Sequence, residues 1–493
     1  MEPNQPSPPA IATPVAIVTG GMLTQMLFQI ALQAIVSRQL GTNYAVDAYE
    51  AAVAIPLVIS SMVTLPLGAI LIPLVTRVRE RRGEEAAWES ASSLVLTLIV
   101  FTLALATGVA VYRTEILTSL YKLSSAEVAI ASDVLWIVVW LIPANTVIAL
   151  SQGIYHWRGS FALPAAAGVF GPAVTLAVLI LQGPVTVSLL ATATIAGAAA
   201  STALQLPLLF RRLQWRISPA TLRDAARLTG PVLLGAIYWR LDPMIDRSIG
   251  SGFDEGTLAS LGYCSRVTNA MAALAAGGLS VVAFPRMSAA AGRSSVELAR
   301  ETSRAVGASL LILVPLATAW FMFGDAIVRD LLEGGRFTPA DTARVSHFIR
   351  CAIGVVIGGS VGEIFARAFY AQHDTLVPVL IGASCMTAGF GLKWGFSRAW
   401  GPGGLLIASS LATCASAGIQ FIILRRRFGP ELRTYLFSQG MTAAIATAAA
   451  CAAGWAVLQA GVRFPAFCGG AAGLAVYLAG LYLLRRPQPN VAA

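Results

Sequence analysis

The sequence predicts an all-α integral membrane protein with about fourteen transmembrane helices, arranged as two pseudo-symmetric six-helix lobes and an appended C-terminal helix pair. Three observations predict this class. Of the 493 residues, 56% are hydrophobic and 12% are charged, with a mean hydropathy of +0.72, whereas a soluble domain has roughly 25% charged residues. Long apolar segments recur along the whole chain, and the second half repeats features of the first.

Each apolar segment is long enough to cross a hydrocarbon layer of roughly 30 Å. The predicted spans are 15–37, 46–76, 88–112, 128–156, 160–181, 184–210, 219–248, 256–285, 299–323, 343–371, 374–397, 402–424, 434–459 and 465–484. Prolines inside several of them, such as Pro143, remove a backbone donor and bend a helix. A bend of this kind is either a static kink or a hinge for transport.

The repeat is visible at three places in the same order. Arg38, Gly41 and Pro73 are answered by Arg247, Gly250 and Pro285. The stretch 116–127 is answered by 327–341, and Tyr155 with Pro164 is answered by Tyr370 with Pro378. Offsets of about 209 to 215 residues that keep their order indicate a duplicated transporter fold.

The repeat and the loop composition divide the chain. We expect a disordered cytoplasmic tail at 1–14, an N-lobe of six spans at 15–216, a C-lobe of six spans at 217–427, the appended helix pair at 428–486 and a tail at 487–493. Loops on one side carry about nineteen Lys and Arg residues against nine on the other. Because cytoplasmic loops are enriched in basic residues, both termini are expected in the cytoplasm of a multi-pass inner-membrane protein.

Several function classes are excluded or disfavoured. The net charge of +10 comes from arginines in short loops, with no basic run interleaved with aromatics, so no nucleic-acid partner is expected. The six cysteines lie singly in apolar segments, the three histidines have no metal-ligand spacing, and no P-loop is present. We therefore expect no metal, no cofactor, no catalytic residues and no enzyme; a membrane-embedded glycosyltransferase would also need a longer outward loop.

Ionisable residues within spans are the strongest candidates for function, because each is costly in lipid and faces a cavity or a partner. The predicted span 219–248 carries Arg240, Asp242, Asp246 and Arg247, and further candidates are Asp47, Glu50, Arg266, Glu363 and Arg367. They form either a cavity for an anion and a coupling cation, or structural pairs between helices. Asp133 and Lys393 are nearer span ends, where snorkelling to the interface explains them.

Four stretches resemble the MviN/MurJ family of bacterial lipid-linked oligosaccharide flippases: AIVSRQLGTNYAVDAY at 34–49, 231–267, LLEGGRFTPADT at 331–342 and RAFYAQHDTLVPVLIG at 367–382. The resemblance implies two six-helix lobes around a cationic cavity that binds the pyrophosphate of an undecaprenyl-linked sugar and works by alternating access. It also implies a substrate role for Asp47 and Arg266, to which we add Arg240 from its place in a span. Asp242, Asp246, Arg38 and Glu363 are the expected ion or gate residues.

The chain departs from the family pattern where the family carries charge. Met26, Leu32 and Gln33 replace two arginines and an acid in the first span, and Ser60 and Ser61 replace an arginine pair in the second. The leading prediction is still a lipid II flippase. The alternatives are a flippase for a lipid-linked exopolysaccharide unit and a cation-coupled multidrug exporter of the same superfamily. A monomer surrounded by membrane lipid, coupled to the membrane potential or a monovalent cation, is expected.

Overall fold

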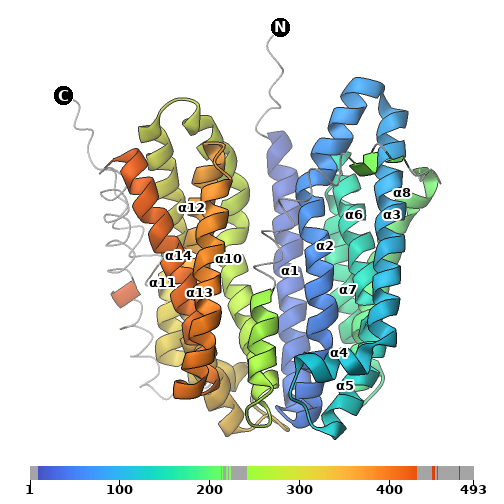
Figure 1. Ribbon diagram of the computed structural model, residues 1–493, viewed down its shortest axis with the longest axis vertical. Helices are drawn as coiled ribbons and strands as arrows, with labels where there is room; N and C mark the ends of the chain where they lie inside the picture. Colours follow the sequence, from blue (N-terminus) through green and yellow to red (C-terminus); the bar gives the residue numbers. More distant parts are fainter. Residues whose placement is uncertain are drawn as a thin grey trace. The chain divides into compact units, whose positions relative to one another are not determined.

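The computed structural model describes residues 9–212 and 241–429, together with a few isolated positions at 214, 218, 219, 221–223, 447–449, 452 and 477. Within this part the elements are helices joined by turns and short loops, with one isolated β-bridge between Gly334 and Phe337. The helices (Figure 1) are α1 (Pro9–Leu40), α2 (Tyr44–Arg82), α3 (Glu84–Val111), α4 (Arg113–Leu120), α5 (Ser125–Val138), α6 (Leu141–Trp157), α7 (Ala162–Leu181), α8 (Val187–Arg212), α10 (Thr257–Ala291), α11 (Ser295–Leu332), α12 (Pro339–Ala371), α13 (Leu376–Trp400) and α14 (Pro402–Phe428).

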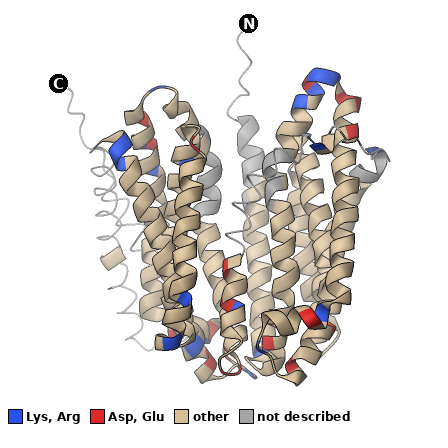
Figure 2. Ribbon diagram, in the orientation of Figure 1, with Lys and Arg blue, Asp and Glu red and all other residues tan. Residues whose placement is uncertain are grey.

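The predicted all-α membrane fold is confirmed. Ten of the described helical segments are long and apolar enough to cross a membrane. The predicted spans 434–459 and 465–484, and the tail 487–493, lie almost entirely outside the described residues, so the number fourteen remains a prediction. Charged residues gather mainly toward the helix ends in each half of the chain (Figure 2), as expected for segments whose middles meet lipid.

Two predicted boundaries differ from the structure. Helix α1 begins at Pro9, so residues 9–14 are helical and do not belong to the predicted tail. The span predicted at 128–156 is two helices, α5 and α6, which meet at residues 139–140. The cause is Pro143: without an N–H it cannot donate to the carbonyl of Val139, which accepts from the Ile142 N–H at 3.0 Å instead.

The chain divides into two compact units, unit 1 (Met1–Ala259) and unit 2 (Ser260–Ala493). In unit 1, α2 packs against α3, α5 and α6, while α7 packs against α1 and α8. In unit 2, α12 packs against α11 and α14, and α13 packs against α14. The predicted lobe boundary at 216/217 lies outside the described residues.

Small residues bring the helices close together, as is usual in lipid. In unit 1, a Cβ on Gly171 of α7 would lie 2.9 Å from the carbonyl oxygen of Gly197 of α8, and the reverse contact would be 2.6 Å. Ser201 of α8 also donates its hydroxyl to the carbonyl of Ala167 at 2.7 Å. Glycine and serine therefore serve as packing residues where a soluble core would use Leu or Ile.

Candidate functional site

The start of α2 places two acids on the buried face of the helix. Gly41 has a φ of 69° and turns the chain after α1, and the Asn43 side chain accepts from the N–H groups of Ala45 and Val46 as the N-cap. Asp47 and Glu50 follow one turn apart and are 4% and 3% exposed. Residues three apart share a helix face, so both carboxylates point the same way.

Asp47 holds the N-terminus of another helix. Its Oδ2 accepts from the N–H of Gly256 at 2.6 Å, and its Oδ1 accepts from the N–H of Ala259 at 2.7 Å. Gly256 directly precedes α10 and has a φ of 83°, so the Asp47 carboxylate satisfies two donors that no residue within the helix satisfies. A carboxylate at a helix N-terminus is also favoured by the helix dipole.

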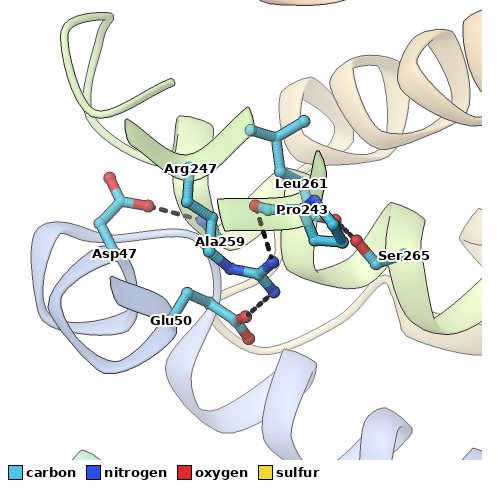
Figure 3. A network of polar contacts seen from close by, with 7 residues as sticks. All are labelled: Asp47, Glu50, Pro243, Arg247, Ala259, Leu261 and Ser265. Atoms are coloured by element: carbon cyan, nitrogen blue, oxygen red, sulfur yellow. Dashed lines mark hydrogen bonds and ion pairs between the residues drawn. The ribbon is translucent and has the colours of Figure 1, made fainter. Parts of the chain in front are cut away.

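Glu50 holds the chain just before this turn. Arg247 lies 3.2 Å from the Glu50 carboxylate and donates a second bond, of 3.4 Å, to the carbonyl of Pro243 (Figure 3). The backbone N–H of Tyr44 donates to Glu255 at 2.9 Å. We call Asp47, Glu50, Arg247 and Glu255, with the N–H groups of 256 and 259, the latch.

The other side of the same segment is fastened to the loop after α4. Ser248 donates to the carbonyl of Leu120 at 2.6 Å, and the N–H of Lys122 donates to Ser251 at 2.8 Å. Tyr121 lies between these two bonds and is 3% exposed. Burial raises the pKa of Tyr121 to about 12, although the charge of Arg247 acts to lower it, so the phenol is neutral at physiological pH.

The remaining predicted site residues fall at several places. Asp242 and Asp246 are half-buried in the helical stretch that leads to Arg247, and Arg38 is exposed at the end of α1. In unit 2, Arg266 is exposed on α10, and Glu363 pairs with Arg367 on α12 at 2.5 Å. Arg240 lies outside the described residues. A common cavity for Asp47, Arg240 and Arg266 therefore remains a prediction.

The sequence interpretation of Lys393 was wrong. It does not snorkel to the interface: it is 1% exposed in α13, with Nζ 6.0 Å from the centre of the Phe390 ring. Gly389 packs on Ala412 and Gly404 packs on the carbonyl of Phe396, so Lys393 lies inside the α13–α14 contact. The missed signal is Gly389, one turn before Lys393, where a Cβ would lie 2.9 Å from Ala412 of α14.

Among the described residues, no group of three or more His, Cys, Asp or Glu side chains is arranged to hold a metal ion. The Cys351 thiol and His347 Nε2 on α12 lie 3.6 Å apart, and Asp325 pairs with Arg350 at 2.7 Å between α11 and α12. Both are pairs within unit 2. Among the described residues, the latch is the most extensive set of polar contacts between separate segments of the chain.

The family model described as lipid II flippase MurJ matches residues 36–465. The lipid II flippase MurJ of Burkholderia cenocepacia is 24% identical over 430 residues, which is 83% of this chain and 83% of that protein. A probable lipid II flippase MurJ of Rhizobium meliloti is 24% identical over 221 residues, 44% of this chain and 41% of that protein.

Solved structures share the fold. A lipid II flippase MurJ in an inward closed conformation superposes with a TM-score of 0.79 and 17% identity, covering 94% of this chain and 98% of that chain. A multidrug resistance MATE family transporter of the MOP superfamily, in an inward-facing conformation, gives a TM-score of 0.71 and 14% identity, covering 85% of this chain and 99% of that chain.

Proposed function

We propose that this chain, which belongs to the MurJ family of lipid II flippases, moves lipid II from the inner to the outer leaflet of the cytoplasmic membrane by alternating access. Lipid II is an undecaprenyl-pyrophosphate-linked glycan. The observation that carries this proposal is the family match over 36–465. The chain is thus a multi-pass membrane transporter. We further propose that it catalyses no covalent reaction and acts as a monomer.

The latch gives this transport cycle a closed state. Three bonds to ionised side chains, two to Asp47 and one to Glu50, hold residues 247–259 against the start of α2. A hydrogen bond to a charged group contributes roughly 1.5–3 kcal/mol. We propose that the latch breaks and reforms once per cycle, because a buried contact of this strength is stable enough to close a pathway and weak enough to reopen.

We propose that Arg266 and Arg240 bind the pyrophosphate, since arginine offers a fork of donors that matches phosphate oxygens. The arginines expected from the family in the first two spans are replaced here. Ser60 is 3% exposed and lies 3.4 Å from the carbonyl of Leu141, so this position packs α2 on α6. Gln33 is half-buried on α1 and offers an amide where the family has an acid.

Two other cargoes share this fold. A lipid-linked exopolysaccharide unit carries the same pyrophosphate and would use the same arginines. A cation-coupled multidrug exporter would need carboxylates in place of arginines, and the family match favours the flippase. We propose coupling to the membrane potential or a monovalent cation, with Asp242 and Asp246 as the residues that would bind the ion.

The test is translocation of fluorescent lipid II in proteoliposomes that contain the purified protein. Wild type is expected to flip lipid II, Arg266→Ala to abolish flipping, and Arg266→Lys to restore part of it, because Lys keeps the charge without the fork. Arg398→Ala, on an arginine stacked over Trp394 with Cζ 3.5 Å from the ring centre, is the matched control. Normal flipping by Arg266→Ala would refute the proposal that Arg266 binds the pyrophosphate.

The cargo is tested in the same vesicles. The proposal is supported if the protein flips lipid II and a lipid-linked exopolysaccharide precursor does not compete with it. No lipid II flipping, together with uptake of a cationic dye driven by an ion gradient, would refute it in favour of the exporter.

The latch is tested with Asp47→Asn and Glu50→Gln, which keep side-chain size. Each variant weakens charge-assisted bonds, so we expect the closed state to be less populated. A cysteine introduced by Ser251→Cys is then expected to react faster with a soluble thiol reagent. An unchanged labelling rate at that position would contradict the latch.

Topology is tested at the turn between α2 and α3. We propose that this turn and both termini face the cytoplasm. Glu85→Cys, in a background without native cysteines, is expected to resist an impermeant thiol reagent in intact cells. Gly83 is unsuitable for this test because its φ of 89° would strain a cysteine.

A further inference from the structure

At one end of unit 1, two tryptophans contact each other and each is covered by an arginine. The Arg79 Cζ lies 5.7 Å from the centre of the Trp157 ring, and the Arg158 Cζ lies 6.0 Å from the Trp88 ring. The two tryptophan rings meet edge to face, with centroids 5.6 Å apart and planes at 76°. We call Arg79, Trp157, Trp88 and Arg158 the Arg–Trp ladder.

The ladder is built on a packed core from three helices. Arg79 lies on the last turns of α2, Trp88 on the second turn of α3, and Trp157 is the last residue of α6. Trp88 belongs to a cluster of buried residues that includes Leu74, Leu94 and Ile154, and Trp157 packs against it. The single residue between α2 and α3, Gly83, fixes the spacing of these two helices.

The guanidinium groups of the ladder keep their donors available. Stacking on an aromatic ring uses the face of the guanidinium, and its N–H groups lie at the edge. Within the described part of the chain, neither Arg79 nor Arg158 has an ion pair or a side-chain hydrogen bond. The acids of the neighbouring turn, Glu80, Glu84, Glu85 and Glu89, make no ion pair with them there either.

Four arginines of unit 2 are arranged differently. They pair with carboxylates: Arg293 with Glu297 at 3.6 Å, Arg304 with Glu301 and Arg367 with Glu363 at 2.5 Å each, and Arg427 with Asp374 at 2.7 Å. A carboxylate partner occupies the edge donors that a phosphate would use. The ladder therefore differs from these arginines in its free donors as well as its tryptophans.

We propose that the Arg–Trp ladder is a binding site for the phosphate of an anionic phospholipid headgroup in the leaflet that surrounds this end of unit 1. Trp157 ends a segment long and apolar enough to span a membrane, and Trp88 lies in the first turns of another. Tryptophan at such a position sits at the level of the headgroups. Phosphate matches the arginine fork, and anionic lipids collect at basic groups near the membrane surface.

The test measures binding of phosphatidylglycerol to the purified full-length protein in detergent by native mass spectrometry, with phosphatidylcholine as the neutral comparison. Arg79→Gln with Arg158→Gln is expected to weaken phosphatidylglycerol binding about thirtyfold, because each basic group near the surface strengthens binding about fivefold. Arg79→Lys with Arg158→Lys is expected to recover part of this loss. The matched control is Arg293→Gln with Arg304→Gln, two exposed arginines of unit 2, which is expected to leave binding unchanged.

Two results would overturn the proposal. The first is equal phosphatidylglycerol binding by wild type and the Arg79/Arg158 variant, or an equal loss in the control. The second is displacement of the lipid by inorganic phosphate at comparable concentration, which would identify a site for a soluble anion. Lipid II flipping in zwitterionic vesicles is measured in parallel, so failure of the transport proposal is distinguished from failure of the lipid site.

Discussion

The fourth predicted span of unit 1 and its counterpart in unit 2 have the same ends and different middles. Both begin with a capping box, Ser124 with Glu127 before α5 and Thr338 with Asp341 before α12. Unit 1 then breaks into α5 and α6, whereas unit 2 has one helix of 33 residues. Elements duplicated in sequence thus retain their local caps while their interiors diverge.

The turns that follow the two spans repeat each other in the backbone. The N–H of Gly159 donates to His156 O at 2.9 Å and that of Ser160 to Tyr155 O at 2.9 Å; the N–H of His373 donates to Tyr370 O and that of Asp374 to Phe369 O, each at 3.0 Å. The third residue of the next helix is a proline in both units, Pro164 and Pro378. The shared offset is 214 residues, so Tyr155 corresponds to Phe369, and the sequence match of Tyr155 to Tyr370 was one residue out of register.

The interiors differ because of one proline and the neighbouring helix. At this offset Pro143 corresponds to Ile357, which has an N–H, so α12 continues. Near the same level, the Ser410 hydroxyl of α14 donates to Cys351 O at 2.7 Å and accepts from the N–H of Val355 at 3.2 Å. A side chain from α14 therefore takes part in the backbone hydrogen bonding of α12 without ending the helix.

The largest expected effect tests this difference directly. Ile357→Pro removes a backbone donor and clashes with the carbonyl of Ile353, so it should destabilise unit 2 by about 3 kcal/mol or more. The measurement is the apparent unfolding temperature of the purified protein in detergent. Ile357→Ala is the control for the lost side chain, and Pro143→Ala should cost far less. Equal losses for Ile357→Pro and Ile357→Ala would show that the backbone of α12 is as tolerant as that of α5–α6.

The second prediction concerns the close contact of α12 with α14. A Cβ on Gly358 would lie 2.7 Å from the backbone nitrogen of Cys414 and 2.8 Å from the carbonyl carbon of Thr413. Gly358→Val should therefore destabilise the protein by about 1–3 kcal/mol through overpacking. Gly359→Val, at a position with open space around it, is the control in the same unfolding assay. Equal stability of the two variants would mean that α12 and α14 can separate at no cost.

The third prediction uses the matching turns. Gly159 and His373 have φ values of 74° and 60°, and a left-handed conformation costs a residue with a side chain roughly 1–2 kcal/mol. Gly159→Ala should lower the free energy of unfolding by about 1 kcal/mol. His373→Gly should relieve strain and leave the protein equally or slightly more stable. A clear loss in His373→Gly would mean that the histidine ring, and not the turn, stabilises unit 2.

The smallest expected effect is a pH dependence confined to unit 2. Burial acts to raise the pKa of Asp374, but the hydrogen bond from Arg427 and those from backbone N–H groups outweigh it and hold the pKa below the ordinary value of 3.8. A carboxyl with a lowered pKa stabilises the fold above its ordinary pKa, and this contribution is lost as the pH falls through the lowered value. Because the pair is partly exposed, Asp374→Asn should cost less than about 1 kcal/mol at pH 7.

The measurement is the difference in unfolding temperature between Asp374→Asn and wild type, followed from pH 7 to below 3.8. The difference should shrink as the carboxyl is protonated. Ser160→Ala, at the uncharged counterpart in unit 1, should show no such trend. A difference that is constant with pH would show that Asp374 acts through shape and not through charge.

The sequence by itself determined the membrane class, the helices and the repeat, because these depend on local chemistry. Apolar length predicts a span, and the matching stretches 116–127 and 327–341 were recognisable from their residues alone. Three ionisable residues of the latch, Asp47, Glu50 and Arg247, were also visible as acids and an arginine in apolar surroundings, and pairing between helices was one of the two expected arrangements.

Only the tertiary structure decided which groups those residues meet. Asp47 holds two backbone N–H groups more than 200 positions away in the chain, Lys393 is buried where its position near a span end suggested snorkelling, and Ser410 completes the backbone of another helix. Every residue except proline has a backbone N–H, so the sequence does not show which of these donors a side chain will meet. The burial of a side chain depends on which helix packs over it. These contacts are long-range, so no local pattern could specify them.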